Sequence, residues 1–102
     1  MSVITVTKSN FEEIKGSEKP VLLDFYADWC GPCRMVSPIV DEIAEENADI
    51  VVGKINVDNE PELAQMFEVF TIPTLVVLRG GEVVNTASGA RPKAQILALL
   101  EG

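Results

Sequence analysis

Two cysteines, Cys30 and Cys33, stand two residues apart in the stretch "WCGPC", and the chain holds no other. Such a pair can close a structural disulfide, supply part of a metal site, or open and close as a redox couple. A structural bridge would close too short a loop to stabilise the fold much through chain entropy. A structural zinc site needs about four ligands, usually cysteine and histidine, and the chain has no histidine. The residue types therefore favour a redox couple.

The elements expected around the cysteines support this chemistry. The apolar run "PVLLDFYA" predicts a buried strand, and apolar residues at helical spacing predict a helix after the cysteines. Cys30 is then expected at or near the helix N-cap, where free backbone N–H groups and the helix dipole favour a thiolate. Cys33 lies one turn further on the same face, within reach of a disulfide. Pro32 suits a first-turn position, and Gly31 leaves the approach to the cysteines unobstructed.

The rest of the chain alternates between strand and helix patterns. Strands are predicted at residues 2–6, 20–27, 49–57, 74–78 and 82–88. Ser9 and Glu12 have the spacing of a capping box for the first helix, and Asp58 and Asn59 are expected to cap the third. Pro38 lies within the second helix and is expected to kink it. The order β-α-β-α-β-α-β-β-α, with "RGG" as the hairpin turn, predicts an α/β fold with a central mixed sheet flanked by helices.

Composition and charge restrict the possible functions. The chain has 102 residues, of which 47% are hydrophobic and 24% charged, as expected for a single domain over residues 1–102 with its own core. The formal net charge of −8 disfavours binding to nucleic-acid phosphates or anionic membranes. The N-terminal residues lack a signal-peptide pattern, and no apolar run reaches the ~20 residues that span a bilayer. The expected location is therefore the cytoplasm, where close cysteine pairs are more often catalytic or metal-binding than structural.

Taken together, the stretches "DFYAD", "WCGPC" and "TIPT" resemble the thioredoxin family, and the resemblance extends over the whole chain. It implies the thioredoxin fold and a general protein-disulfide reductase, with Cys30 as nucleophile and Cys33 as resolving cysteine. It implies neither a bound cofactor nor a metal. The implied partners are a thioredoxin reductase, flavin-containing or ferredoxin-linked, and target proteins that contain disulfides. We expect the chain to act as a monomer.

One carboxylate stands inside the apolar run. Leu22 and Tyr26 share a strand face with Asp24, so burial should raise the pKa of Asp24, unless it lies on the polar face of an edge strand. In the family, the matching aspartate exchanges protons with the inner cysteine, which implies this role for Asp24 toward Cys33. Lys54 matches a family lysine near that aspartate, and an ordinary solvated lysine is the alternative.

The resemblance also implies a docking surface for target proteins. In the family, the tryptophan that matches Trp29 flanks the cysteines. The alternative for Trp29 is that it packs in the core as an ordinary aromatic residue. The Ile72–Pro73 bond is cis in the family, against a base rate of ~5–6% for bonds before proline, and leaves the Ile72 backbone free to pair with an extended substrate. The expected docking face consists of Gly31, Pro32, Ile72, Pro73, Gly89 and Ala90. Ser88 is polar at a docking position that is often apolar in the family, and Arg91 lies close by in the sequence. These two residues are therefore expected to affect which partners bind.

Two other functions remain open on the residues alone. An oxidant or isomerase has the same fold, although the Gly-Pro dipeptide and the lack of a signal-peptide pattern favour a reductant. A binding module would use the fold rather than the thiols, and its partner would still be captured after replacement of both cysteines.

Overall fold

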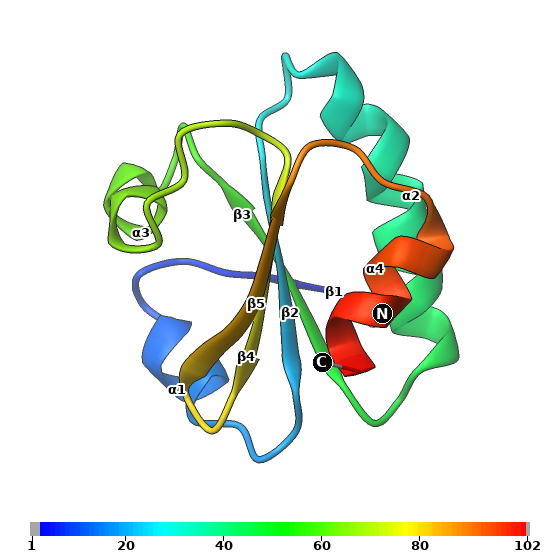
Figure 1. The fold of residues 1–102 in the computed structure, drawn as a ribbon. Coiled ribbons are helices and arrows are strands. Elements are labelled where there is room, and N and C mark those ends of the chain that lie inside the picture. The colour runs from blue at the N-terminus through cyan, green and yellow to red at the C-terminus, as the bar shows by residue number, and fades with distance from the viewer. Residues whose placement is uncertain (1–2, 102) are drawn as a thin grey trace.

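The computed structural model describes residues 3–101, which form strands and helices in the predicted order (Figure 1). The strands are β1 (Val3–Thr5), β2 (Val21–Tyr26), β3 (Val51–Asn56), β4 (Thr74–Arg79) and β5 (Glu82–Ser88). The helices are α1 (Phe11–Lys15), α2 (Gly31–Glu46), α3 (Pro61–Met66) and α4 (Lys93–Glu101). The predicted α/β class and element order are therefore confirmed. Ser2, at the start of the first predicted strand, lies outside the described residues.

The strands form one mixed sheet in the order β1-β3-β2-β4-β5. Strands β1, β3 and β2 are parallel, whereas β4 runs antiparallel to both β2 and β5. Because β2 is the central strand and both of its faces are covered, residues 21–25 are all buried. This position explains why the segment reads as a nearly continuous apolar run.

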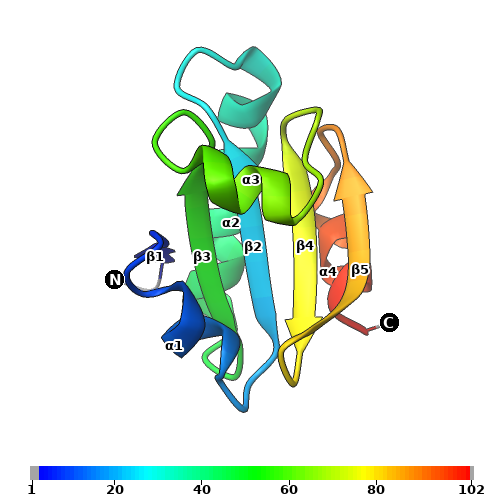
Figure 2. The ribbon, with the colours of Figure 1, turned by 90° about the vertical axis from the view of Figure 1, so that its left-hand side faces the viewer.

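Helices cover both faces of the sheet, as the sequence predicts. Figure 2 shows α1 and α3 in front of the sheet, with α2 and α4 behind it. Phe11 and Leu63 pack with Phe25 on the first face, and Val40 and Ile96 pack with Leu22 on the second. None of the helices within residues 3–101 is long and apolar enough to cross a membrane.

The predicted capping box of α1 is wrong. The N-cap of α1 is Asn10, and neither Ser9 nor Glu12 closes a side-chain cap there. The Asn10 side chain instead accepts from the Thr7 N–H at 2.8 Å and donates to the Thr5 carbonyl at 2.9 Å. Because the amide serves the turn that leaves β1, it stabilises the approach to the helix rather than its first turn.

The predicted caps of α3 are also wrong. Glu60 is the N-cap and makes no side-chain cap bond, so neither Asp58 nor Asn59 has that role. Pro61 opens the helix, which removes one of the N–H groups that a cap would have to satisfy. The carboxylate of Asp58 is occupied elsewhere, by the indole of Trp29.

The hairpin between β4 and β5 turns at Gly80 and Gly81, as predicted. Their φ angles are +60° and +82°, in the left-handed region that side chains rarely adopt. The sequence "RGG" therefore supplies glycine at the two positions where this turn requires it.

Candidate redox site

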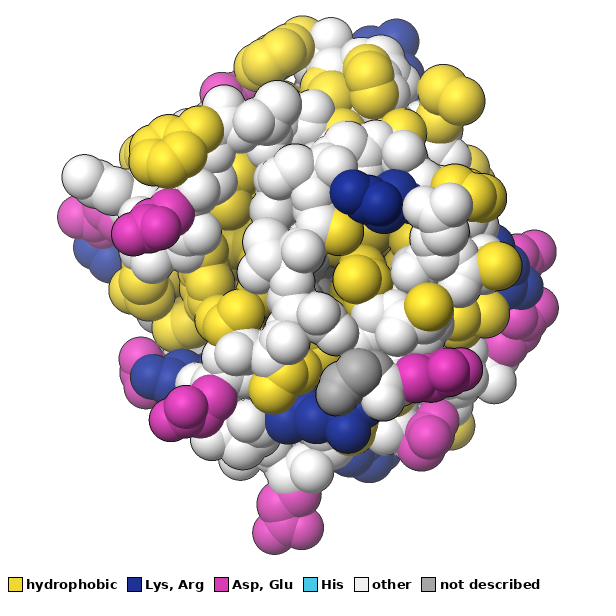
Figure 3. Space-filling view, viewed as in Figure 1, with side chains coloured by type: hydrophobic (Ala, Val, Ile, Leu, Met, Phe, Trp, Pro, Cys, Tyr) yellow, Lys and Arg dark blue, Asp and Glu magenta, His cyan; other side chains and the backbone are white. Residues whose placement is uncertain are grey.

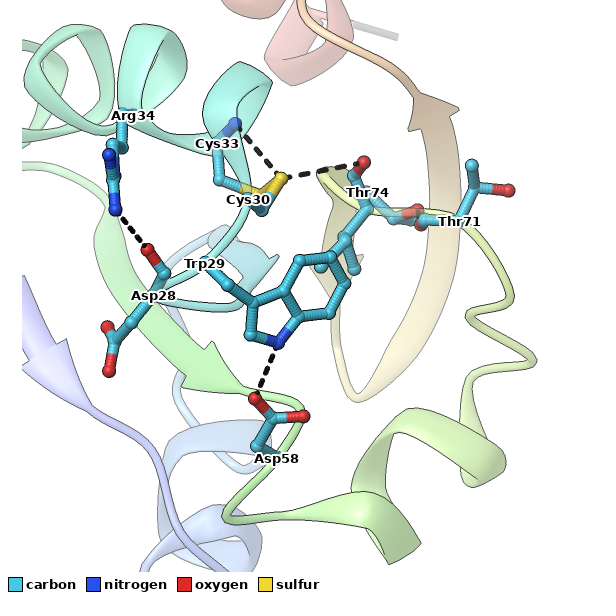
Figure 4. Close-up of a disulfide and its surroundings, with 9 residues drawn as sticks. Asp28, Trp29, Cys30, Cys33, Arg34, Asp58, Thr71 and Thr74 are labelled. Carbon is cyan, nitrogen blue, oxygen red and sulfur yellow. Dashed lines mark hydrogen bonds between the residues drawn. A yellow bond between two sulfur atoms is a disulfide. The ribbon is translucent and has the colours of Figure 1, made fainter.

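The cysteines lie where the chain passes from β2 into α2 (Figure 4). Cys30 is the N-cap of α2, with extended backbone, and Pro32 falls in the first turn, as predicted. Cys33 follows one turn later, and the two Cα atoms are 5.3 Å apart. The two sulfurs are joined in a disulfide, so the structure is the oxidised form.

The Cys30 sulfur has two polar neighbours. The Cys33 N–H donates to Cys30 Sγ at 3.2 Å, and the Ile72 carbonyl oxygen lies 3.9 Å from the same sulfur. Both cysteines are only 3% exposed. In the reduced protein, the N–H group and the helix N-terminus would stabilise a thiolate on Cys30. The carbonyl shows that the Ile72 segment runs directly beside the reactive sulfur.

Asp24 is a buried carboxylate on the central strand. The residue is 1% exposed, and Oδ1 has no hydrogen-bond partner among residues 3–101. Burial raises the pKa of Asp24 from its ordinary value to about 6, against the opposing effect of the Lys54 charge, and the Asp41 carboxylate adds to the rise. Asp24 is flanked by β3 and β4, so the alternative of an edge-strand aspartate is wrong.

Lys54 stands beside Asp24 in the register of β2 and β3. Its ammonium lies 2.7 Å from Asp41 Oδ1 and donates to the hydroxyl and the carbonyl of Ser37. The lysine side chain is 16% exposed, so the alternative of an ordinary solvated lysine is wrong. Lys54 instead joins the sheet to α2 next to the buried aspartate.

A row of residues on α2 connects these groups with the disulfide. Cys33, Ser37 and Asp41 follow each other at four-residue intervals, which places them on one helix face. A hollow of about 150 Å³ opens beside this row and is lined by Tyr26, Ala27, Asp28, Cys33, Arg34 and Ser37. Ser37 and Asp41 were not predicted as site residues, although their spacing from Cys33 is a signal that indicates them.

Trp29 is a surface residue, so the alternative of a core aromatic is wrong. It is 69% exposed, and its Nε1–H donates to Asp58 Oδ2 at 2.9 Å. Figure 4 shows the indole beside the disulfide, directed toward Asp58 in the loop between β3 and α3. Asp58 was not predicted as the residue that orients this ring.

The loop before β4 completes the surroundings of the disulfide. The Ile72–Pro73 bond is cis, as predicted. The Gly89 N–H donates to the Pro73 carbonyl at 2.8 Å, and Gly89 has a φ of +93°, which favours glycine. Since Ile72 also contacts Cys30 Sγ, the structure brings together the three segments of the predicted docking face. Gly31, Pro32 and Ala90 of that face are exposed, Ile72 and Gly89 are half-buried, and Pro73 is buried.

Two large apolar side chains near the site were missed by the sequence analysis. Phe70, two residues before Ile72, is 89% exposed, and Met35, two residues after Cys33, is 68% exposed. Exposure of isolated apolar side chains is ordinary, but both stand on segments that carry the disulfide or contact it. Their exposure is not visible in the sequence, where each continues an apolar pattern.

Comparison with known proteins agrees with this geometry. The thioredoxin family model matches residues 2–102. A thioredoxin of Alicyclobacillus acidocaldarius is 45% identical over 97% of this chain and 95% of its own, and one of Pyropia yezoensis is 50% identical over 98% and 95%. A bifunctional thioredoxin reductase/thioredoxin of Mycobacterium leprae is 46% identical over 92% of this chain and 21% of its own. With its closed Cys-Gly-Pro-Cys disulfide, the chain belongs to the thioredoxin family of thiol–disulfide oxidoreductases.

Proposed function

We propose that the protein is a general protein-disulfide reductase of the cytoplasm, acting as a monomeric single domain over residues 1–102. Its electrons come from a thioredoxin reductase, flavin- or ferredoxin-linked, and pass to disulfide-containing targets. The observation that carries the proposal is the position of Cys30 Sγ, between the Cys33 N–H and the Ile72 carbonyl at the start of α2. The name of the Mycobacterium leprae relative, which couples a reductase with a thioredoxin, supports such a donor.

In the first step, the Cys30 thiolate of the reduced protein attacks one sulfur of a target disulfide. A bond forms between Cys30 and that sulfur, the target disulfide breaks, and the leaving thiolate takes a proton from water. The N–H of Cys33 and the N-terminus of α2 favour the attacking thiolate. The product is a mixed disulfide between protein and target.

In the second step, Cys33 loses its proton to Asp24 and attacks Cys30. The intramolecular disulfide forms, the mixed disulfide breaks, and the second target sulfur leaves as a thiolate that water protonates. The target has gained two electrons and two protons, and the protein is in the disulfide form seen in the structure. The raised pKa of Asp24, about 6, suits a group that accepts a thiol proton and then returns it near neutral pH.

Target docking rests on the backbone rather than on a deep pocket. An extended target segment pairs with the backbone of Ile72 beside the disulfide. Gly31, Pro32 and Ala90 supply a small exposed surface with little to discriminate among side chains. Trp29, held by Asp58, borders this surface with an amphipathic ring. Such a surface suits a reductant with many targets.

The equilibrium reduction potential tests the direction of electron flow. We expect a reduction potential of about −270 mV, measured against glutathione, together with reduction of insulin disulfides. A value of about −120 to −180 mV, as in oxidants and isomerases, would contradict the proposal.

A variant with both cysteines replaced by serine should lose all reductase activity. If it keeps the biological activity of the protein, the chain is a binding module instead.

Lys54→Gln should move the pH dependence of turnover upward. The Lys54 charge lowers the pKa of Asp24, so its removal raises that pKa further and reduces the fraction of Asp24 able to accept a proton at pH 7. We expect turnover at pH 7 to fall by up to about tenfold and to recover at higher pH, since one pKa unit is a tenfold change in ionisation. The charge-retaining Lys54→Arg should keep most of the wild-type profile. Identical profiles for all three proteins would remove Lys54 from the mechanism.

A further inference from the structure

A groove beside the redox site carries a charge that the thiol chemistry does not use. It has a volume of about 310 Å³ and is lined by Met35, Ile39, Ala90, Arg91 and Pro92. One wall of the groove is formed by Met35 and Ile39 of α2, the helix that begins at the disulfide. Its other wall begins at Ala90, immediately after Gly89, whose N–H binds the Pro73 carbonyl. A target segment docked along the disulfide therefore passes the mouth of this groove.

The guanidinium of Arg91 is held in place by its neighbours. Nη2 donates to the Ser88 carbonyl at 3.1 Å, and Nη1 donates to Gln95 Oε1 at 3.4 Å. Nε is buried and has no acceptor. These contacts use neutral oxygens, so they fix the position of the side chain without compensating its charge.

The charge of Arg91 has no carboxylate partner. The protein has a net charge of −8, yet among residues 3–101 no carboxylate forms an ion pair with Arg91. Arg34 and Arg79 likewise bind backbone carbonyls, whereas ion pairs are formed by Lys8, Lys54 and Lys93. What distinguishes Arg91 is its place in the groove beside the docking face. Figure 3 shows basic colour over the segment between β5 and α4, surrounded by hydrophobic and uncharged atoms. A fixed, uncompensated guanidinium in an apolar setting is suited to a carboxylate.

We propose that this groove binds an acidic side chain of the target, an Asp or Glu close to the cysteine that Cys30 attacks. The carboxylate pairs with Arg91, and the aliphatic part of the side chain lies against Met35 and Ile39. The proposal rests on the proposed function and adds a preference to it. Backbone pairing at Ile72 admits many targets, and the groove favours those with an acid at the right position.

Peptide disulfides of defined sequence test this preference. The reduced protein is mixed with peptides that differ at one position, where Glu, Gln or Lys is scanned over the residues flanking the reactive cysteine. At one of these positions, the peptide with Glu should be reduced about threefold faster than the peptide with Gln. A factor of this size corresponds to the free energy of a partly exposed ion pair. The advantage should shrink as ionic strength rises. Arg91→Gln should bring the ratio to about one, and Arg91→Glu should favour Lys instead.

Arg34→Gln is the matched control. Arg34 stands next to Cys33 but outside the groove, where its Nη2 binds the Asp28 carbonyl, and its replacement changes the net charge equally. This variant should keep the preference for Glu, and equal thermal midpoints would show that both variants are folded. If Arg91→Gln keeps the preference, or if Arg34→Gln loses it equally, the groove is not the cause and the proposal is wrong.

Three further outcomes separate this inference from the proposed function on which it rests. If Arg91→Gln slows only the reduction of the protein by its reductase, while the peptide ratio is unchanged, the groove serves the reductase and the proposal is wrong. If none of the peptides is reduced, the proposed function fails and the inference fails with it. If the peptides are reduced without any preference, only the inference fails.

Discussion

Cys33→Ser should accumulate a mixed disulfide with target proteins through Cys30, whereas Cys30→Ser should accumulate none. Only Cys30 is the N-cap of α2, with a backbone N–H donated to its sulfur and the Ile72 segment beside it. Without a thiol at position 33, nothing within the protein resolves the bond that Cys30 forms. Both variants should lose turnover completely. The adducts can be counted on non-reducing gels and located by mass spectrometry.

Three observations would contradict this division of roles. Equal trapping by the two variants would mean that either cysteine can attack. Trapping only by Cys30→Ser would reverse the roles, and turnover by either single variant would show that one thiol is sufficient. A double Cys→Ser variant supplies the background, because any protein that it retains is bound without a covalent bond.

The fold followed from the sequence because its strongest signals are local. The apolar run at residues 20–27 became the central strand β2, buried on both faces, and "RGG" became a turn with two positive φ angles. The helix caps were predicted less well. The N-cap of α1 is Asn10 rather than the predicted Ser9, and its side chain serves the turn after β1, while the predicted cap Asp58 binds the Trp29 indole. Such partners come from the tertiary structure, which residue preferences at the helix end do not describe.

The site was predictable where one motif sets the geometry. The position of Cys30 at the N-cap follows from a strand, a cysteine pair and a helix in succession. The contacts of Lys54 with Ser37 and Asp41 could not be derived in this way, because they join β3 to α2 across residues distant in sequence. The absence of an ion pair at Arg91 within residues 3–101 is equally invisible in sequence. It depends on which oxygens surround the guanidinium, and these belong to Ser88 and Gln95.

Asp24→Asn should stabilise the protein at neutral pH. The folded-state pKa of Asp24 is about 6, against an ordinary value of 3.8, so the native state binds this proton more tightly than the unfolded state does. Well below pH 3.8 both states are protonated and the wild type has no penalty. As the pH rises from 3.8 to about 6, the unfolded state ionises while the native state keeps its proton, and the free energy of unfolding falls by about 3 kcal/mol relative to a chain without this group.

The pH dependence is a sharper test than the stability at one pH. An asparagine inherits a buried site in which Asp24 Oδ1 has no hydrogen-bond partner, which adds a cost that does not vary with pH. The difference in unfolding free energy between Asp24→Asn and wild type should therefore grow by about 3 kcal/mol from about pH 3 to pH 7, whatever its value at the lower pH. Denaturant titrations at a series of pH values measure it. Asp49→Asn, which changes an exposed aspartate, should show no such growth.

The same substitution should slow the release of target from the mixed disulfide. Cys33 loses its proton acceptor, and we expect the resolution step to slow roughly tenfold to a hundredfold, at or below the lower end of what a positioned base contributes. Stopped-flow measurement of this step, with stability measured on the same samples, separates the two effects. A variant that is more stable but equally fast would leave Asp24 as a buried charge without a function. A variant that is slower but shows no pH-dependent gain in stability would mean that the pKa of Asp24 is not raised, and that its effect on Cys33 has another cause.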